Sequence, residues 1–259
     1  MDLREIRARG EVVRHPWELA RFEVVCDLLK KYVGEKDRLN ILDLGCGDTF
    51  FVENLAQRFT NSQFYGVDIE FADEDLEMLS DKLKDEPIQL FRTLDDLEAG
   101  AAPKAIDIVL LLDVVEHIEF DVEFLQMLHN KSYITDQTKI FITVPAFQSL
   151  YTSHDDFLGH YRRYDNTHLE RTIQKAGFQK LKVGYFFGSL LPVRALKVVK
   201  EKLFGKDEES TGLVEWSGSK GKTNLIKNVL QLDYKIGQIT GGKLPGLSNY
   251  IVINKDVRR

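Results

Sequence analysis

The chain is poor in cysteine, with two in 259 residues, and it lacks long apolar runs. Cys26 lies in an apolar helical pattern and Cys46 in a glycine-rich turn, so a disulfide framework is not the source of stability. A spanning helix needs about 18 consecutive apolar residues, and no stretch reaches this length. The N-terminal residues 1–5 are too charged for a signal peptide. We therefore expect a cytoplasmic protein without a spanning segment.

Positive charge is also in short supply, because the net charge is −6 at pH 7. Such a chain has no basic footprint for nucleic acid, so we expect no nucleic-acid partner. Histidine and cysteine at zinc-ligand spacing are missing. The adjacent acids Asp95-Asp96 and Asp155-Asp156 are typical of solvated or helix-capping positions rather than of a magnesium site. We therefore expect no bound metal.

The most informative motif is the segment ILDLGCGD at residues 41–48, an apolar strand that runs into a turn with two glycines. Gly45 and Gly47 allow a sharp turn and a close approach to a ligand. Asp68 follows the next strand, where an acid can hold a ribose diol. The dinucleotide fingerprint needs a third glycine three residues after the second, but Phe50 stands there. The motif therefore indicates a nucleoside ligand that is not a dinucleotide.

The charges of this turn narrow the choice of ligand. Asp43 and Asp48 repel a pyrophosphate but favour a cation. A ligand that carries an ammonium, a sulfonium and a ribose fits these residues, and S-adenosylmethionine is such a ligand. Here the sequence resembles the class I S-adenosylmethionine-dependent methyltransferases, whose first motif is acidic-x-Gly-x-Gly. The resemblance, together with the positions of the strand ends, predicts these cofactor-binding residues: Asp43, Gly45, Gly47, Asp68, Ile69, Thr93, Leu94, Asp113 and Val114.

Strand-like and helix-like patterns alternate along the first two thirds of the chain. Strands are predicted at 39–44, 63–67, 88–91, 106–112 and 139–144, and helices at 17–32, 49–59, 73–83, 120–129 and 166–176. This alternation predicts an α/β fold with a doubly wound, mostly parallel sheet. Two further strand-like runs at 178–187 and 248–253 give seven strands, and the resemblance implies that the last strand runs antiparallel.

We expect four parts of the chain: an N-terminal helical cap (1–38), the methyltransferase core (39–189), a helical insertion (190–246), and the last strand with a tail (247–259). Within the insertion, 190–204 is apolar with interleaved basic residues, 205–222 is a Gly-, Ser- and Lys-rich loop, and 223–239 is a second helix. An amphipathic insertion can pack on the sheet edge, cover the active site, or lie on a membrane surface. Peripheral membrane contact stays open, and so does the choice between a monomer and a homodimer.

The fourth strand ends in Asp113-Val114-Val115-Glu116-His117, which resembles the Asp-x-x-Glu-His segment of many small-molecule methyltransferases. The resemblance implies that Asp113 and Val114 line the methionine and the sulfonium, with Glu116 and His117 near the acceptor pocket. These acids could instead cap a helix N-terminus.

Residues 144–164 carry an unusual density of ionisable groups for a connecting segment, and they resemble a branch related to the ubiquinone-type O-methyltransferases. His154 or His160 could remove a proton from a hydroxyl, because an imidazole suits that task near neutral pH. The predicted catalytic residues are therefore His154, His160 and His117. The predicted substrate-binding residues are Asp155, Tyr161, Arg162 and Arg163, with the guanidinium groups suited to an anionic acceptor.

Arg21 in the first helix could meet the methionine carboxylate or pair with Glu18. Together these features predict a methyltransferase that acts on a small molecule, sugar or lipid-linked intermediate, with oxygen as the expected acceptor atom. The alternatives are a catalytically idle S-adenosylmethionine-binding scaffold and a dinucleotide-dependent oxidoreductase. A nucleic-acid or protein methyltransferase is disfavoured, because Val144-Pro145 lacks the flanking residues of the aromatic motif for amide-nitrogen methylation.

Overall fold

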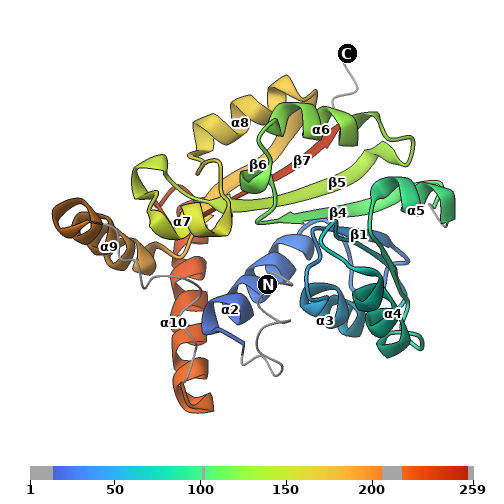
Figure 1. Ribbon diagram of the computed structural model, residues 1–259, viewed down its shortest axis with the longest axis horizontal. Helices are drawn as coiled ribbons and strands as arrows, with labels where there is room; N and C mark the ends of the chain where they lie inside the picture. Colours follow the sequence, from blue (N-terminus) through green and yellow to red (C-terminus); the bar gives the residue numbers. More distant parts are fainter. Residues whose placement is uncertain (1–13, 101–102, 206–217, 256–259) are drawn as a thin grey trace.

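The computed structural model describes residues 14–100, 103–205 and 218–255. Within them, seven strands form one twisted sheet in the order β3-β2-β1-β4-β5-β7-β6 (Figure 1). The first five pair in parallel, whereas β7 runs antiparallel to both β5 and β6. The doubly wound, seven-strand sheet with an antiparallel last strand is therefore confirmed. The strands are β1 (Asn40–Leu44), β2 (Gln63–Val67), β3 (Ile88–Phe91), β4 (Ile106–Leu112), β5 (Ile134–Pro145), β6 (Phe178–Phe186) and β7 (Ser248–Lys255).

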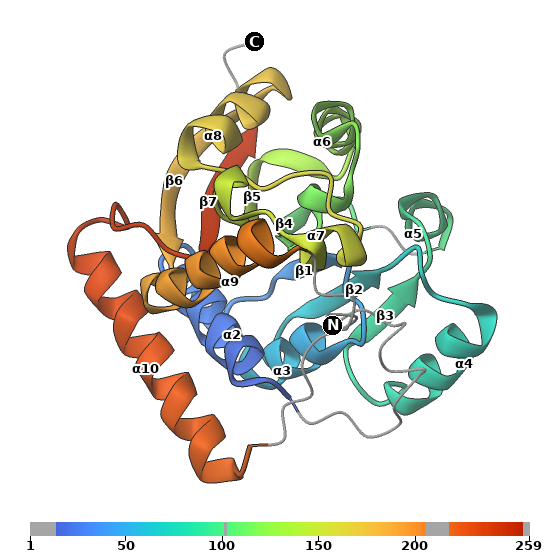
Figure 2. The same cartoon turned by 60° about the vertical axis from the view of Figure 1, so that its left-hand side comes forward.

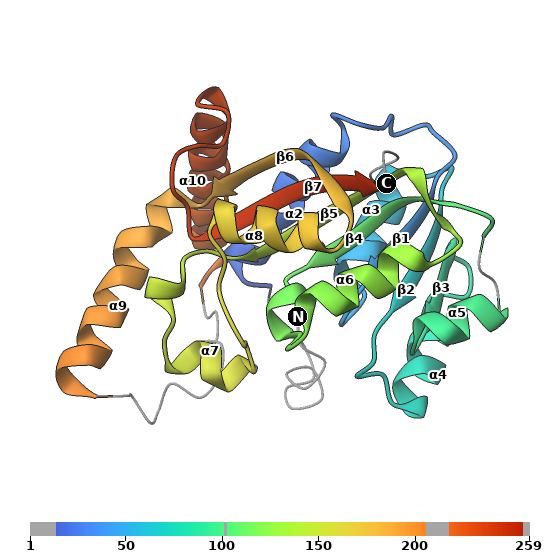
Figure 3. The same cartoon turned by 90° about the horizontal axis from the view of Figure 1, so that it is seen from above.

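Helices cover both faces of the sheet (Figures 1 and 3). On β4, Ile108 and Leu110 join one apolar cluster, whereas Val109 and Leu111 join the other. Successive side chains of a strand point to opposite faces, so an all-apolar strand must be buried on both. One cluster includes residues of α2 (Pro16–Leu29), α3 (Phe50–Arg58) and α10 (Lys220–Ile239). The other includes residues of α5 (Leu94–Gly100), α6 (Asp121–Asn130) and α8 (Asn166–Lys175).

Several element boundaries differ from the sequence prediction. Helix α5 was not predicted from the sequence, because it is short. Its start is fixed by two hydrogen bonds, from the Thr93 N–H to the Asp96 carboxylate and from the Asp96 N–H to the Thr93 hydroxyl. Strand β5 begins at Ile134 rather than at residue 139. The predicted loop at 205–222 is wrong at its end, because α10 begins at Lys220, where the Ser219 side chain accepts a hydrogen bond as the N-cap. Residues 206–217 of that predicted loop lie outside the described residues.

The remaining elements lie in the connections between the strands. They are α4 (Asp73–Lys82), the short 3-10 turns Val115–His117, Gln148–Leu150 and Gly188–Leu190, α7 (Ser153–Leu158) and α9 (Leu191–Phe204). Helix α7 lies inside the stretch that the sequence predicted to be irregular. Helices α9 and α10 project from one end of the molecule, where β6 and β7 form the edge of the sheet (Figures 1 and 2). Within the described ranges, no helix has both the length and the apolar character to cross a membrane.

Candidate active site

The turn after β1 leaves space that only glycine provides. Gly45 has a φ of +81° and Gly47 a φ of +53°. Residues other than glycine rarely adopt this left-handed backbone conformation. A Cβ atom on Gly45 would lie 2.5 Å from Cγ2 of Val114, the residue after Asp113 at the end of β4. The turn therefore brings bare backbone against the carboxyl ends of β1 and β4, where ligands bind in open α/β sheets.

Asp68 fixes this turn from the neighbouring strand. One carboxylate oxygen, Oδ2, accepts a hydrogen bond from the Gly47 N–H at 2.7 Å, and Oδ1 accepts one from the Glu70 N–H at 2.9 Å. Burial raises the pKa of Asp68. The acid thus lies beside the glycine turn, as its predicted role requires, and it also holds the turn in shape.

Asp43 is a buried acid that lacks a full set of partners. It is 2% exposed, and its Oδ2 atom accepts no hydrogen bond from the described part of the chain. Burial raises the pKa of Asp43 to about 7. A buried carboxylate is costly unless a positive group or donor reaches it. The arrangement therefore fits a cationic ligand next to the turn, which is what the methionine end of S-adenosylmethionine provides.

Arg21 of α2 spans the distance to the end of β4, where it forms an ion pair with Asp113. Its guanidinium lies over the ring of Trp17 at 4.4 Å from the centroid. Asp113 also accepts a hydrogen bond from the Thr143 hydroxyl at 2.9 Å and has a φ of +58°. The predicted alternative pair with Glu18 is therefore wrong, because Arg21 reaches across to the strand end instead.

Glu18 has other partners, and so does Asp48. Glu18 accepts a hydrogen bond from the His15 N–H at 3.2 Å, which caps α2. Arg14 lies 3.6 Å from the Glu18 carboxylate and also forms an ion pair with Asp48. Asp48 therefore already has a cationic partner within the chain, whereas the Oδ2 atom of Asp43 has no hydrogen-bond partner among the described residues.

Three other predicted cofactor-binding residues, Ile69, Thr93 and Leu94, follow the ends of β2 and β3. Ile69 is 73% exposed. The Thr93 N–H and hydroxyl both donate hydrogen bonds to Asp96, and Leu94 is buried in the core. Their assignment to the cofactor remains a prediction that rests on position.

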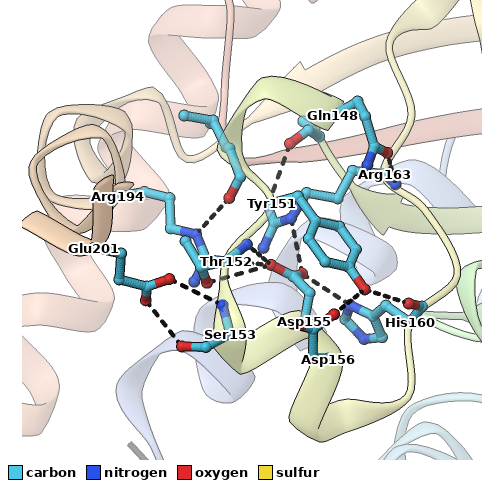
Figure 4. A network of polar contacts seen from close by, with 12 residues as sticks. Gln148, Tyr151, Thr152, Ser153, Asp155, Asp156, His160, Arg163, Arg194 and Glu201 are labelled. Atoms are coloured by element: carbon cyan, nitrogen blue, oxygen red, sulfur yellow. Dashed lines mark hydrogen bonds and ion pairs between the residues drawn. The ribbon is translucent and has the colours of Figure 1, made fainter. Parts of the chain in front are cut away.

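The segment predicted to bind the methyl acceptor is organised around Asp155, a fully buried carboxylate in α7 (Figure 4). Oδ1 accepts a hydrogen bond from Arg163 Nε at 2.8 Å and lies 2.9 Å from Nδ1 of His160. Oδ2 pairs with Arg194 of α9. Burial alone would raise the pKa of Asp155, but the His160 hydrogen bond and the two guanidinium charges outweigh burial and hold the pKa well below its usual value. Asp155 is therefore ionised, and its carboxylate accepts the hydrogen bonds from Arg163 and His160.

Since Asp155 accepts, the His160 proton belongs on Nδ1, which leaves Nε2 as the basic nitrogen. The His160 ring packs edge-on against the His117 ring, with 4.6 Å between centroids. The Tyr161 N–H donates to the Glu116 carbonyl at 2.8 Å. This bond ties the loop that carries His160 to the end of β4, beside Asp113.

Glu116 lies under this histidine pair. It is completely buried, and neither of its carboxylate oxygens accepts a hydrogen bond from another described residue. Burial, followed by the nearby charge of Asp113, raises its pKa well above the usual value. One donor atom each of Glu116, His117 and His160 lie within 4.8 Å of one another, a set of groups that can hold a divalent metal ion.

His154 lies in different surroundings. Burial and the charges of Lys197 and Arg194 lower its pKa to about 4. A histidine with so low a pKa is a weak base at neutral pH. Of the two histidines predicted as alternative bases, only His160 is held by a carboxylate.

The two predicted arginines of the acceptor loop are occupied within the chain. Arg162 donates to the Ile118 and Glu119 carbonyls and lies 3.0 Å from the Asp121 carboxylate. Arg163 is buried against Asp155, whereas Tyr161 is 52% exposed. The two arginines therefore hold the loop in shape, whereas half of the Tyr161 side chain is exposed to solvent.

Two residues of this site were not identified from the sequence. Arg194 and Glu201 project from one face of α9, and Glu201 accepts hydrogen bonds from the Ser153 N–H and hydroxyl, each at 3.0 Å. The spacing of seven residues places both side chains on the same helical face. That spacing was visible in the sequence, but nothing local indicated that the face meets α7.

Comparison with known proteins agrees with this geometry. Residues 17–183 match the family model described as a methyltransferase domain, and no curated protein matches the chain. The match covers well over half of the chain. The fold and site define a class I α/β methyltransferase, and the chain belongs to the methyltransferase-domain family. S-adenosylmethionine is its cofactor. The alternative prediction of a dinucleotide-dependent oxidoreductase is therefore excluded.

Solved structures with the same fold share little sequence with this chain. An S-adenosylmethionine-dependent methyltransferase from Archaeoglobus fulgidus is 20% identical, with 98% of each chain covered and a TM-score of 0.51. Coclaurine N-methyltransferase, bound to N-methylheliamine and SAH, is 13% identical, with 92% of this chain and 72% of the other covered and a TM-score of 0.56. The [4+2]-cyclase SpnF is 12% identical, with 96% and 85% covered and a TM-score of 0.54. At such identities the likeness shows the fold and not the acceptor.

Proposed function

We propose that the protein transfers the methyl group of S-adenosylmethionine to a hydroxyl oxygen of a small molecule, sugar or lipid-linked intermediate. The observation that carries the proposal is the Asp155–His160 pair, tied by the Tyr161 N–H to the strand end that bears Asp113. A carboxylate that orients an imidazole is a common device for activating a nucleophile. A hydroxyl needs such help, because its proton has a high pKa.

Residues of the glycine turn hold the cofactor in this proposal. Asp43 receives the methionine ammonium, Gly45 and Gly47 leave room for the backbone to approach, and Asp68 receives the ribose. When bound, the cofactor supplies an electrophilic methyl group on a sulfonium. Displacement at that carbon is mainly a matter of alignment, which can contribute up to about 7 to 11 kcal/mol in well-oriented reactions.

His160 removes the proton from the acceptor hydroxyl through Nε2, because its Nδ1–H is held by Asp155. The resulting imidazolium is stabilised by the same carboxylate. The Arg163 and Arg194 contacts keep Asp155 ionised and in place. His117 packs against His160 and limits the positions that its ring can take.

The test is a methyl-transfer screen over hydroxylated metabolites, sugars and lipid-linked sugars, followed by variants of the base. We expect His160→Gln to lower kcat by about 10²- to 10⁴-fold, the usual range for general base catalysis. The affinity for S-adenosylhomocysteine, measured by calorimetry, should stay within a few fold. His154→Gln is the matched control and should keep most of the activity.

Two results would contradict this mechanism. One is full activity in His160→Gln, which would leave positioning alone as the source of catalysis. The other is loss of activity after treatment with a chelator and recovery with Zn²⁺, which would make Glu116, His117 and His160 metal ligands. Transfer to nitrogen-containing but not hydroxylated acceptors would overturn the choice of oxygen.

A further inference from the structure

Helices α9 and α10 display more apolar side chains to solvent than the other elements that the structure describes. Eighteen large apolar side chains are exposed in the described residues, and ten of them lie on these two helices. On α9 they are Val193, Leu196, Val199, Leu203 and Phe204, and on α10 they are Leu225, Val229, Leu232, Ile236 and Ile239. Exposed apolar side chains gathered in this way mark an interaction site.

On each helix these residues form one stripe. The α10 positions are separated by four, three, four and three residues, so they share a single helical face. The opposite face of α10 packs on the core through Leu230 and Tyr234. Both helices lie at the same end of the molecule (Figure 1). Both stripes therefore lie at one end of the protein.

The charge of the two helices is opposite to that of the whole chain. Each carries four basic residues and one acidic residue, although the chain has a net charge of −6. The acidic residues, Glu201 and Asp233, accept hydrogen bonds from Ser153 and Ser189. An apolar stripe with basic flanks is complementary to an anionic lipid surface. A second copy of the chain would instead bring basic residues against basic residues.

The inner face of α9 reaches the acceptor side of the active site. Arg194 pairs with Asp155, and its Nε donates to the Leu150 carbonyl at 3.0 Å. Glu201 holds Ser153 at the start of α7 (Figure 4). A surface that binds the outer face of α9 therefore lies one helix diameter, about 10 to 12 Å, from the contacts between α9 and α7, and Asp155 of α7 holds His160.

We propose that α9 and α10 dock the protein on an anionic lipid bilayer, and that the methyl acceptor is an amphiphile held in that bilayer. The docking follows from the apolar stripes and their charge. The acceptor class rests on the proposed function, since it requires a polar head group that reaches His160 while its apolar tail stays in the lipid.

The test is co-sedimentation of the full chain with vesicles, without cofactor or acceptor. Vesicles of phosphatidylcholine with phosphatidylglycerol should bind at least about tenfold more protein than phosphatidylcholine alone, and high salt should weaken binding. The double variants Leu232→Ser/Ile236→Ser and Leu196→Ser/Leu203→Ser should each lose most of the binding. Met78→Ser on α4, which removes an equally exposed apolar side chain at another site, should bind as the wild type does.

Equal binding to neutral and anionic vesicles, or none to either, would overturn the proposal. A second contradictory result would be a wild-type protein that does not bind vesicles and is a dimer in analytical ultracentrifugation, with the double variants monomeric. The stripes would then contact a second copy of the chain. The double variants should bind S-adenosylhomocysteine normally in calorimetry. Loss of that binding would indicate damage to the methyltransferase site, which is a separate failure from loss of docking.

Discussion

The buried acid Asp43 should destabilise the protein at neutral and alkaline pH when no cofactor is bound. The pKa of its carboxyl is about 7 in the folded chain, against an ordinary value of 3.8, because burial disfavours the charged form. Asp68 and Asp48 add to this effect, and Arg21 opposes it. Asp43→Asn keeps the shape of the side chain and removes the charge, so it isolates this cost.

The sign and size of this change in stability follow from the pKa of Asp43 in the folded chain and from its ordinary value. Between about pH 4 and pH 7 the folded carboxyl keeps a proton that the unfolded chain releases, so the free energy of unfolding falls as pH rises, by about 1.4 kcal/mol per pH unit. Over the full shift the loss reaches about 4 kcal/mol as an upper bound. Asp43→Asn should therefore be more stable than the wild type at pH 8 and nearly equal to it at pH 4.

Urea unfolding between pH 4 and pH 8 measures this difference, with Asp136→Asn, an exposed acid on β5, as the control that should show none. The same Asp43→Asn variant should bind S-adenosylhomocysteine on the order of 100-fold more weakly at pH 8, because a hydrogen bond to a charged group is lost. A stability difference that does not change with pH would refute the assignment of the cost to burial of the charge. Unchanged ligand affinity would refute the contact with the methionine ammonium.

Three further outcomes follow from the geometry. Gly45→Ala should lower the free energy of unfolding by about 1 to 3 kcal/mol and weaken S-adenosylhomocysteine binding, because its Cβ meets Val114; an unchanged melting temperature and affinity would contradict this. Arg194→Leu removes a partner from a buried carboxylate and should cost about 1 to 3 kcal/mol in urea unfolding, whereas no loss would show that the remaining partners suffice. The thiols of Cys26 and Cys46 are buried and burial raises their pKa, so neither should react with a thiol reagent until the protein unfolds.

The glycine turn and the alternating strands were predictable because they depend on local properties of the chain. Positive φ at Gly45 and Gly47 and the two-faced burial of β4 follow from residue type and periodicity. Short elements were harder to predict. Helix α7 has only six residues and few apolar ones, so it has no periodic apolar pattern that predicts a helix. Contacts with Arg194 and Glu201 of α9 hold it in place.

The sequence by itself determined the fold class, the cofactor motif and the segment 144–164 that carries Asp155, His160 and Arg163. Only the tertiary structure decided which of them pair: Arg21 with Asp113 across 92 positions, and Arg194 with Asp155 across 39. It also decided that His160 rather than His154 is held by a carboxylate. Periodicity reports which face of an element is buried, whereas pairing depends on where the chain brings two elements together in space.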